Sequence, residues 1–336
     1  MGLFAPSAAF ASGRFGSRAA LAGAVGLVAV FGILRAVAPS ATAVIALTVG
    51  VGIGMGLAGA LMPTAVKERF AHRPAFATGI YSVGIVAGAA TASAVAVPFA
   101  EATDGWRSSL LLFSAVTALL VVAWLALTRR EPPHSRGDTR PVRLPWRSAL
   151  AWQLVAIFVL MSVAYYGFNS WLPDAFVERG WSESKAGALV AVLNGGQIVP
   201  ALVVPWFADR WGSRRLYLAV SGFVLSAAAL GLVLAPGGSW GWTAAVGGGF
   251  GVLFPLVMTL PLDVARRPAD VAAVAGMMLG VGYSTSSVAP FALGGLRDAT
   301  GSFDAVLWAL FGAATALFLL CLALTRERLH AGAVRG

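Results

Sequence analysis

The sequence predicts an all-α polytopic membrane protein, and its composition, charge spacing and internal repetition support that class. Of its 336 residues, 58% are hydrophobic and 11% are charged, whereas soluble domains carry about 25% charged residues. Long apolar blocks carry no charge at all, and a block of about 18 or more such residues is typical of a membrane span. Because lipid offers the backbone no hydrogen-bond partners, the spans are expected to be helices.

Ten full spans are predicted, with an apolar fragment before them. The block 216–262 is too long for one span, and Pro236-Gly237-Gly238 divides it into two. Residues 2–12 are interpreted as the tail of a further span. In chain order, the predicted spans are 19–38, 40–63, 75–99, 107–128, 149–172, 186–208, 216–235, 240–262, 271–294 and 305–325.

The positive charges alternate between the two sides of these spans. Of the 24 Lys and Arg residues, 19 fall on one side and 5 on the other. The positive-inside rule makes the richer side cytoplasmic, which places the central segment and the C-terminus there. We therefore expect a multi-pass protein of the cell (inner) membrane. The net charge of +10 belongs to these short loops, so no nucleic-acid partner is expected.

The residues that usually bind metals or cofactors are scarce. Cys321 is the single cysteine and the three histidines lie in connecting segments, so neither a metal site nor a cofactor is expected. GMGLAG at Gly54–Gly59 matches a dinucleotide-binding pattern, but it lies in an apolar block, where small residues favour close helix packing. No span combines a nucleophile, a base and an acid, so an enzyme is not expected.

The chain repeats itself at an offset of about 197 residues. Span 19–38 falls on 216–235, and the three spans that follow fall on their counterparts in the same way. The loop RFGSR at Arg14–Arg18 returns as RWGSR at Arg210–Arg214, at an offset of 196. Several matches in the same order predict two homologous halves, which is an architecture of membrane transporters.

The repeat predicts two pseudo-symmetric helical bundles. The second begins with spans 149–172 and 186–208, whose counterparts would lie before Met1. The first bundle is therefore expected to be incomplete, with about four and a half spans. The predicted segments are an N-terminal bundle, a Pro- and Arg-rich cytoplasmic linker, a six-helix C-terminal bundle and a cytoplasmic tail: 1–128, 129–147, 148–326 and 327–336.

Several motifs indicate a family. The six-plus-six organisation, the basic central loop and the repeated RxGxR loop resemble the major facilitator superfamily. Trp171-Leu172-Pro173, Arg179-Gly180-Trp181-Ser182 and Ala208-Asp209-Arg210 are similar to motifs of the cyanate and 2-nitroimidazole permease family. This resemblance implies transport of a small solute by alternating access, either a small anion such as cyanate or a nitroimidazole-like compound. The implied partners are the solute and the lipid bilayer, and we expect a monomer.

The loop motif of the superfamily is matched by Asp209–Arg215 (DRWGSRR). Glycine permits a tight turn there, and the arginines can bind exposed carbonyl groups at a helix end or pair with the carboxylate. In the first copy, Gly13 stands at the acidic position. An arginine that similar proteins carry in their first helix has no counterpart in this sequence. The resemblance implies a cytoplasmic gate formed by Arg14, Arg18, Asp209, Arg210, Gly212, Arg214 and Arg215.

Polar and aromatic side chains within the spans are the candidates for solute binding. Polar groups in a bilayer usually face the helix bundle, where partners or water satisfy them. Asn194 and Gln197 are three residues apart and share a helix face. Hydrogen bonding between helices is the alternative role. The candidates are Tyr81, Tyr165, Tyr166, Asn169, Asn194, Gln197 and Tyr283.

Two other functions remain open at this stage. The chain could be a broader drug or metabolite exporter, or a truncated remnant that does not transport. No Asp or Glu lies deep in any span, although a carboxylate within the membrane is the usual carrier for proton coupling. A facilitator, or coupling through residues beyond this sequence, would be compatible with this pattern.

Overall fold

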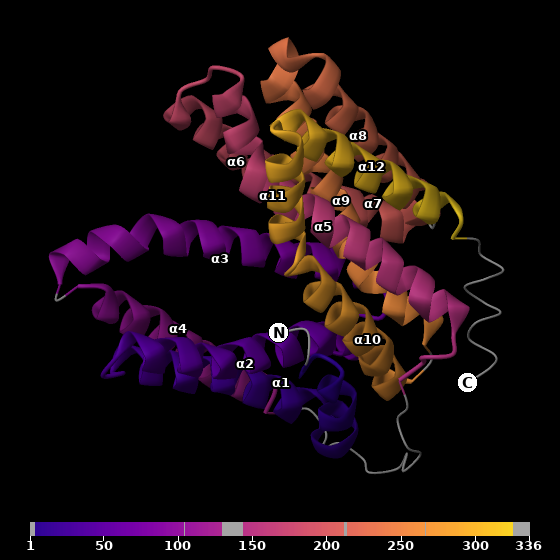
Figure 1. Ribbon diagram of the computed structural model, residues 1–336. Coiled ribbons are helices and arrows are strands. Elements are labelled where there is room, and N and C mark those ends of the chain that lie inside the picture. Colours follow the sequence, from indigo (N-terminus) through magenta and orange to yellow (C-terminus); the bar gives the residue numbers. More distant parts are fainter. Residues whose placement is uncertain (1–3, 104, 130–143, 212–213, 266, 325–336) are drawn as a thin grey trace. The chain divides into compact units, whose positions relative to one another are not determined.

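The computed structural model describes residues 4–103, 105–129, 144–211, 214–265 and 267–324 (Figure 1). Within these residues all the regular structure is helical, and nine segments are long and apolar enough to cross a membrane. The predicted all-α polytopic class is therefore confirmed. The tenth predicted span, 75–99, lies inside α3 (Pro74–Ala102). Most of the predicted linker and the predicted tail lie outside the described residues.

Two of the predicted spans are each built from two helices. Pro200 and Pro290 lie four residues after the last residue of the first helix in each pair. A proline has no N–H to donate, and its ring crowds the carbonyl group four residues earlier, so the helix is interrupted at that point. The pairs are α6 (Glu183–Gly196) with α7 (Ile198–Trp211), and α10 (Pro268–Ser286) with α11 (Ala289–Thr300).

The chain divides into two compact units. Unit 1 comprises Met1–Arg69, Ile85–Pro145 and Ala265–Gly280. Unit 2 comprises Phe70–Gly84, Trp146–Val264 and Val281–Gly336. Each unit thus includes one short segment from the opposite half of the sequence. The predicted division into bundles 1–128 and 148–326 stays a prediction.

Unit 1 is organised around α1 (Ser7–Ala36), which packs on α2 (Ala41–Arg69) and α4 (Trp106–Leu127) (Figure 1). Small residues allow these helices to approach closely. A Cβ added at Gly54 would lie 2.6 Å from the carbonyl oxygen of Ala24. Gly54 belongs to the GMGLAG pattern, so this pattern serves helix packing, as expected for small residues in a membrane.

A kink divides α1 at the first loop motif. Gly16 has φ 76° and ψ 157°, a backbone conformation that side chains other than glycine rarely adopt. The described part of the predicted fragment 2–12 and the predicted span 19–38 therefore lie on either side of this kink. The part before the kink packs against α10, where Ala9 joins Ala272 and Ala273 in a buried cluster.

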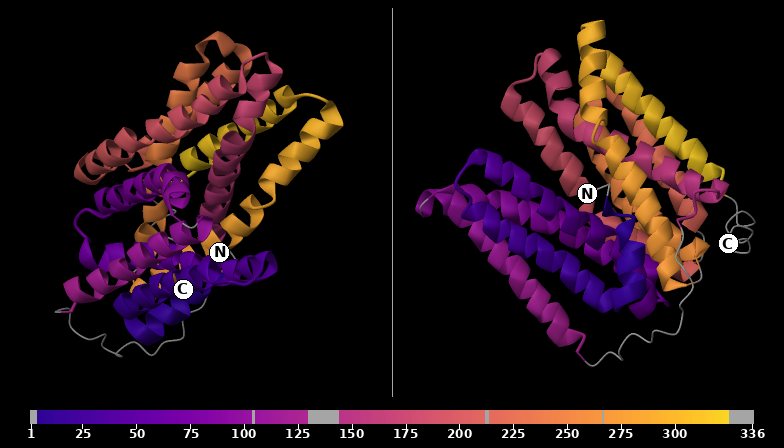
Figure 2. Two further views of the ribbon diagram at one scale, coloured as in Figure 1. Left: turned by 90° about the vertical axis from the view of Figure 1, so that its left-hand side faces the viewer. Right: turned by 60° about the horizontal axis from the view of Figure 1, so that its bottom comes forward.

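Unit 2 is organised around α9 (Ser239–Val264), which contacts α5 (Ala149–Glu178), α6, α7 and α8 (Arg214–Leu234) (Figure 2). Gly247 and Gly251 place α9 directly against α6 and the start of α7. A Cβ added at Gly247 would lie 2.1 Å from the carbonyl oxygen of Leu193, and one added at Gly251 would lie 2.4 Å from that of Gln197. α12 (Phe303–Leu322) packs on α8 and α5 and completes the unit.

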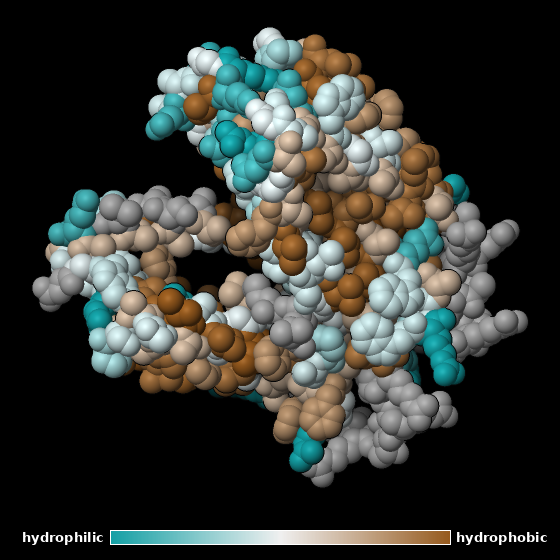
Figure 3. All heavy atoms as spheres, in the orientation of Figure 1, coloured by the Kyte–Doolittle hydropathy of each residue, from teal (hydrophilic) through white to brown (hydrophobic). Residues whose placement is uncertain are grey.

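The surface of unit 2 fits a membrane protein. Figure 3 shows hydrophobic residues over the flank formed by α8 and α12, and hydrophilic residues where α6 begins. Ser182 caps that end of α6 by accepting the N–H of Lys185, at 3.4 Å. An apolar flank with polar ends is the surface that a bilayer requires.

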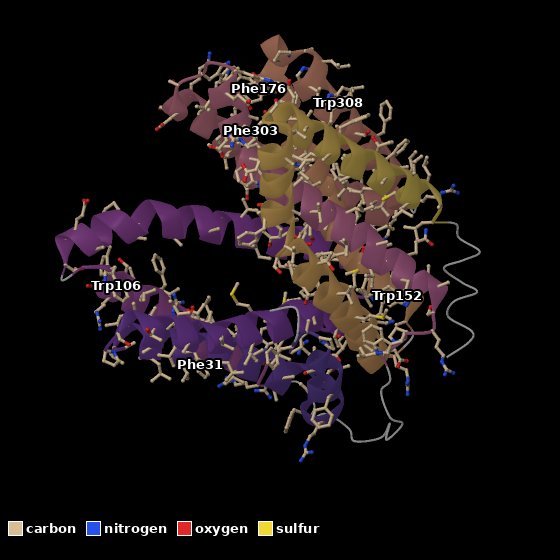
Figure 4. The ribbon with its side chains drawn as sticks, viewed as in Figure 1. Phe31, Trp106, Trp152, Phe176, Phe303 and Trp308 are labelled. Atoms are coloured by element: carbon tan, nitrogen blue, oxygen red, sulfur yellow. The ribbon has the colours of Figure 1, made fainter. Side chains whose placement is uncertain are left out.

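Ionic contacts hold one end of unit 2 together, where Figure 4 labels Phe176 and Phe303. Glu178 accepts the N–H of Phe303 at 2.8 Å. The adjacent Arg179 pairs with Asp304 at 2.7 Å and donates to the carbonyl oxygen of Leu232, also at 2.7 Å. The C-terminal end of α5 is thereby attached to the start of α12 and to the end of α8. A carboxylate at a helix start and a guanidinium at a helix end are both electrostatically favourable.

Candidate functional site

A hydrogen-bonded cluster of polar side chains joins α5 to α6 inside unit 2. The hydroxyl of Tyr165 donates to Oδ1 of Asn194 at 2.9 Å. The side-chain amide of Asn194 donates to Oδ1 of Asn169 at 2.9 Å. Asn169 in turn donates to the carbonyl oxygen of Tyr165 at 2.8 Å. Asn194 of α6 is thus in direct contact with Tyr165 and Asn169 of α5, and we call these three residues, with Gln197, the polar cluster.

Gln197 places the polar cluster at the interruption between α6 and α7. Its side-chain amide donates to Oδ1 of Asn194 at 3.0 Å, and the residue is only 7% exposed. The backbone of Gln197 lies against Gly251 of α9, so a residue larger than glycine at position 251 would displace one of the helices. Sites in secondary transporters typically form where transmembrane helices are discontinuous.

Aromatic rings surround the polar cluster. The ring of Tyr165 packs edge-to-face against Phe250 with centroids 5.4 Å apart, and against Tyr166 at 5.5 Å. Phe250 is buried, so it restricts the rotation of Tyr165. Tyr166 remains 39% exposed.

The two remaining candidates also belong to unit 2. Tyr283 packs edge-to-face against Phe158 with centroids 5.2 Å apart. Tyr81 lies in α3, within the segment Phe70–Gly84 of unit 2. All seven predicted solute-binding residues therefore lie in one unit, and four of them are joined by hydrogen bonds. Contact with a solute stays a prediction for each of them.

The second loop motif forms an ionic cluster at the start of α3. Asp209 accepts the backbone N–H groups of Ala75 at 3.2 Å and of Phe76 at 2.8 Å. These amides belong to the first turn of α3, where backbone N–H groups have no partner within the helix. Asp209 also pairs with Arg214 at 3.1 Å, and its side chain is only 5% exposed. The negative charge is therefore stabilised both by a helix N-terminus and by a guanidinium.

Arg214 connects this carboxylate to a second one. Its other terminal nitrogen pairs with Asp263 near the end of α9. Next to it, Arg215 donates to the carbonyl oxygen of Leu322 in α12, at 3.0 Å. Arg210 lies over the ring of Trp206 at 5.9 Å. Gly212, the predicted turn residue of the gate, lies outside the described residues.

The first loop motif forms different contacts in unit 1. Arg18 donates to the carbonyl oxygen of Leu125 at 3.0 Å and to the hydroxyl of Thr128 at 2.9 Å, both near the end of α4. Ser17 donates to Glu68. Arg14 lies over the rings of Phe10 and Phe15. Of the predicted gate residues of this loop, Arg18 thus anchors a helix end, and the function of both arginines in a gate stays a prediction.

Sequence reasoning did not identify the partners of the loop motifs. Asp263 and Glu68 were not among the candidates, although they follow the corresponding predicted spans 240–262 and 40–63 of the two halves. The repeat could have indicated them, because residues near the same helix end in both halves are expected to serve related roles. The amides of Ala75 and Phe76 carry no side-chain signal, so only the structure identifies them.

The features described define a class of protein. Apolar spanning helices, two halves related by a sequence repeat and an interrupted helix at a polar cluster are characteristic of α-helical membrane transporters. The chain matches the Major Facilitator Superfamily over residues 1–290. It belongs to this superfamily, as the loop motifs indicated.

Similar proteins of known name are bacterial transporters. The chain is 31% identical over 329 residues to the 2-nitroimidazole transporter of Escherichia coli (strain K12), covering 97% of this chain and 84% of that protein. It is 27% identical over 285 residues to the cyanate transport protein CynX of the same organism, covering 82% and 72%. Their names correspond to the two solutes of the permease family that the sequence motifs resembled.

Solved structures show the same fold. The Major Facilitator Superfamily transporter FucP, in the outward conformation, superposes with a TM-score of 0.78 at 15% identity, covering 95% of this chain and 86% of that chain. The proton:xylose symporter XylE, bound to a deoxyglucose derivative, superposes with a TM-score of 0.73 at 15% identity, covering 97% and 85%. The predicted superfamily fold is therefore confirmed.

Proposed function

We propose that this transporter moves a small polar solute with planar hydrogen-bond acceptor groups, and that 2-nitroimidazole is the first compound to test. The observation that carries the proposal is the 31% identity to the 2-nitroimidazole transporter, which extends over 84% of that protein. Cyanate is the second candidate, on 27% identity to a cyanate transport protein.

The chemistry of the polar cluster supports this choice. Asn169 provides an amide group and Tyr166 a phenol group beside the hydrogen-bonded side chains of Tyr165, Asn194 and Gln197. Amide and hydroxyl donors bind the oxygens of a nitro group or the nitrogen of an azole, and aromatic rings pack against a flat heterocycle. Binding sites for small molecules generally combine apolar walls with a few polar groups of this kind.

The ionic cluster of the second loop motif supports a gate. Asp209 attaches α7 to the start of α3, and Arg214 attaches it to α9. In our proposal these contacts hold one transport state in an alternating-access cycle, in which the solute site opens to one side of the membrane at a time. Loss of the contacts would shift the population towards the other state.

The positive charges support an orientation in the bacterial cell membrane. With 19 of 24 Lys and Arg residues on one side of the spans, we propose that the central linker and the C-terminus face the cytoplasm. A Cys321→Ala background with His72→Cys or Thr103→Cys tests this in intact cells. A membrane-impermeant thiol reagent is expected to label Thr103→Cys alone, and labelling of His72→Cys alone would contradict the orientation.

Transport in proteoliposomes tests the proposed substrate. We expect saturable counterflow of labelled 2-nitroimidazole that excess unlabelled 2-nitroimidazole inhibits and empty liposomes lack. Inhibition by cyanate would show that both solutes share the site. Movement of bulky amphipathic compounds without 2-nitroimidazole would instead establish a broader exporter. Movement of none of these compounds would overturn the proposal.

A further inference from the structure

The hydrogen bonds of Asn194 occupy all the groups of its side chain. Its two N–H groups donate to Oδ1 of Asn169 and to the carbonyl oxygen of Val190, both at 2.9 Å. Its oxygen accepts from Tyr165 at 2.9 Å and from Gln197 at 3.0 Å. An amide oxygen has two acceptor sites, and both are used. Asn194 therefore has no hydrogen-bonding group left for a solute.

Asn169 differs from Asn194 in this respect. One N–H of Asn169 donates to the carbonyl oxygen of Tyr165, and its oxygen accepts from Asn194. Among the described residues its second N–H has no acceptor, and a primary amide carries two such groups. The bond from Asn194 determines which way the Asn169 amide faces, because it engages the oxygen and directs the nitrogen to the other side.

Tyr166 offers a second available group. Its side chain is 39% exposed, and in the described part of the chain its hydroxyl forms no hydrogen bond. Its ring is oriented edge-to-face against Tyr165, at an interplanar angle of 72°. The hydroxyl of Tyr165 is already engaged with Asn194. The two adjacent tyrosines are thus in different situations, one within the network and one available.

We infer that the polar cluster has two parts: Asn169 and Tyr166 contact the solute, whereas Asn194 is a positioning residue that acts through Asn169. This inference rests on the proposed function and deepens it. The solute that fits is uncharged or carries a delocalised charge and presents acceptor atoms in a plane, because the two available groups are hydrogen-bond donors on neutral side chains.

A double-mutant cycle on 2-nitroimidazole counterflow tests this division of roles. Removal of one neutral hydrogen bond corresponds to roughly a three- to tenfold change in an equilibrium constant. We expect Asn169→Ala and Asn194→Ala each to raise the half-saturating concentration by about that factor. The double variant is expected to match Asn169→Ala alone, since a residue acting through Asn169 has no further effect once Asn169 is absent.

Tyr166→Phe is the variant that contrasts with Asn194→Ala. It removes only the hydroxyl of an independent contact, so its effect is expected to multiply with that of Asn169→Ala. Gln153→Leu is the matched control on the same helix, because Gln153 bonds to the carbonyl oxygen of Leu320 outside the polar cluster. We expect its half-saturating concentration to equal that of the wild type.

The outcomes separate the inference from the function on which it rests. If the effects of Asn194→Ala and Asn169→Ala multiply, Asn194 contacts the solute independently and the inference is overturned. If Asn194→Ala cannot be recovered folded, Tyr165→Phe replaces it, because it removes a single bond to Asn194. Combined with Asn169→Ala, it is expected to have no effect beyond that of Asn169→Ala alone. If the wild type itself does not move 2-nitroimidazole, the proposed substrate fails, and the inference fails with it.

Discussion

The two loop motifs, RFGSR in unit 1 and RWGSR in unit 2, share four of five letters but bind different partners. The second places the carboxylate of Asp209 on the first turn of α3 and joins it through Arg214 to Asp263. The first has Gly13 at the acidic position and attaches Arg18 to the end of α4. Similar letters therefore produce a cluster with two carboxylates in one unit and a helix-end anchor in the other.

The bonds also shift the correspondence between the motifs by one residue. By sequence, Arg18 aligns with Arg214 at an offset of 196. By contacts, Arg18 corresponds to Arg215, because their acceptors, Leu125 and Leu322, are the same 197 residues apart. Arg214 is thus the arginine without an equivalent in unit 1, and it is the one that joins the two carboxylates. The two loops therefore share an anchoring arginine, and the second loop adds the ionic contacts of Asp209 and Arg214.

Removal of the carboxylate is expected to have the largest effect. Asp209→Ala leaves two amides of α3 without their acceptor and removes one partner of Arg214. Breaking a buried ion pair costs about 3 kcal/mol or more, so we expect a clearly lower unfolding midpoint in detergent and at least tenfold slower counterflow. Asp304→Ala, at an exposed carboxylate, is the control with a small effect. Equal losses in both variants would show that the contacts of Asp209 contribute no more than an exposed ion pair does.

Substitution of Arg214 is expected to come next. An ammonium group cannot bind two carboxylates with the forked geometry of a guanidinium, so Arg214→Lys should retain only part of the contacts to Asp209 and Asp263. Arg214→Ala is expected to lose about 2 kcal/mol, and Arg214→Lys about half of that. Chemical unfolding in detergent measures both. A lysine variant as stable as the wild type would show that charge alone suffices.

The two helix-end arginines should behave alike. Arg18→Ala and Arg215→Ala each remove a charged donor from a carbonyl oxygen near a helix end. Each is expected to reduce stability by about 1 kcal/mol, with Arg18→Ala slightly larger because of its bond to Thr128. Thermal unfolding of the two variants side by side checks this. A much larger effect of Arg215→Ala would instead assign Arg215 to the ionic cluster of the second loop motif.

Introduction of the absent carboxylate should have the smallest effect. Gly13 lies exposed on α1, and surface substitutions usually change stability by less than about 0.5 kcal/mol. We expect Gly13→Asp to unfold and to transport like the wild type, because by the correspondence of contacts Ser17 stands in the first loop where the second has Arg214. A measurable change in counterflow would mean that the first loop already functions as a gate.

The sequence predicted the helices better than it predicted their partners. All ten predicted spans fall on helices, yet two of them proved to be pairs of helices interrupted before Pro200 and Pro290. The prolines were visible, but proline also occurs inside continuous helices here, for example Pro173 in α5. Neighbouring helices can satisfy a backbone group that a proline frees, so the outcome depends on tertiary contacts.

The seven solute-binding candidates show the same limit. Their polarity within apolar spans was visible in the sequence, and the spacing of Asn194 and Gln197 placed both on one face. The bond between Asn194 and Asn169 joins two helices, and no local pattern indicates which amide is saturated. The division between positioning and contact follows only from counting bonds in three dimensions.

By itself, the sequence determined the membrane class, the positions of the spans and the two related halves. These depend on hydropathy, charge and repetition, which are properties of the chain read in order. The tertiary structure alone decided that Asp209 binds the amides of α3, that Arg215 takes the position of Arg18, and that Asn194 has no group free. The physical reason is that a hydrogen bond requires its two atoms to lie about 3 Å apart, and only folding brings such distant residues together.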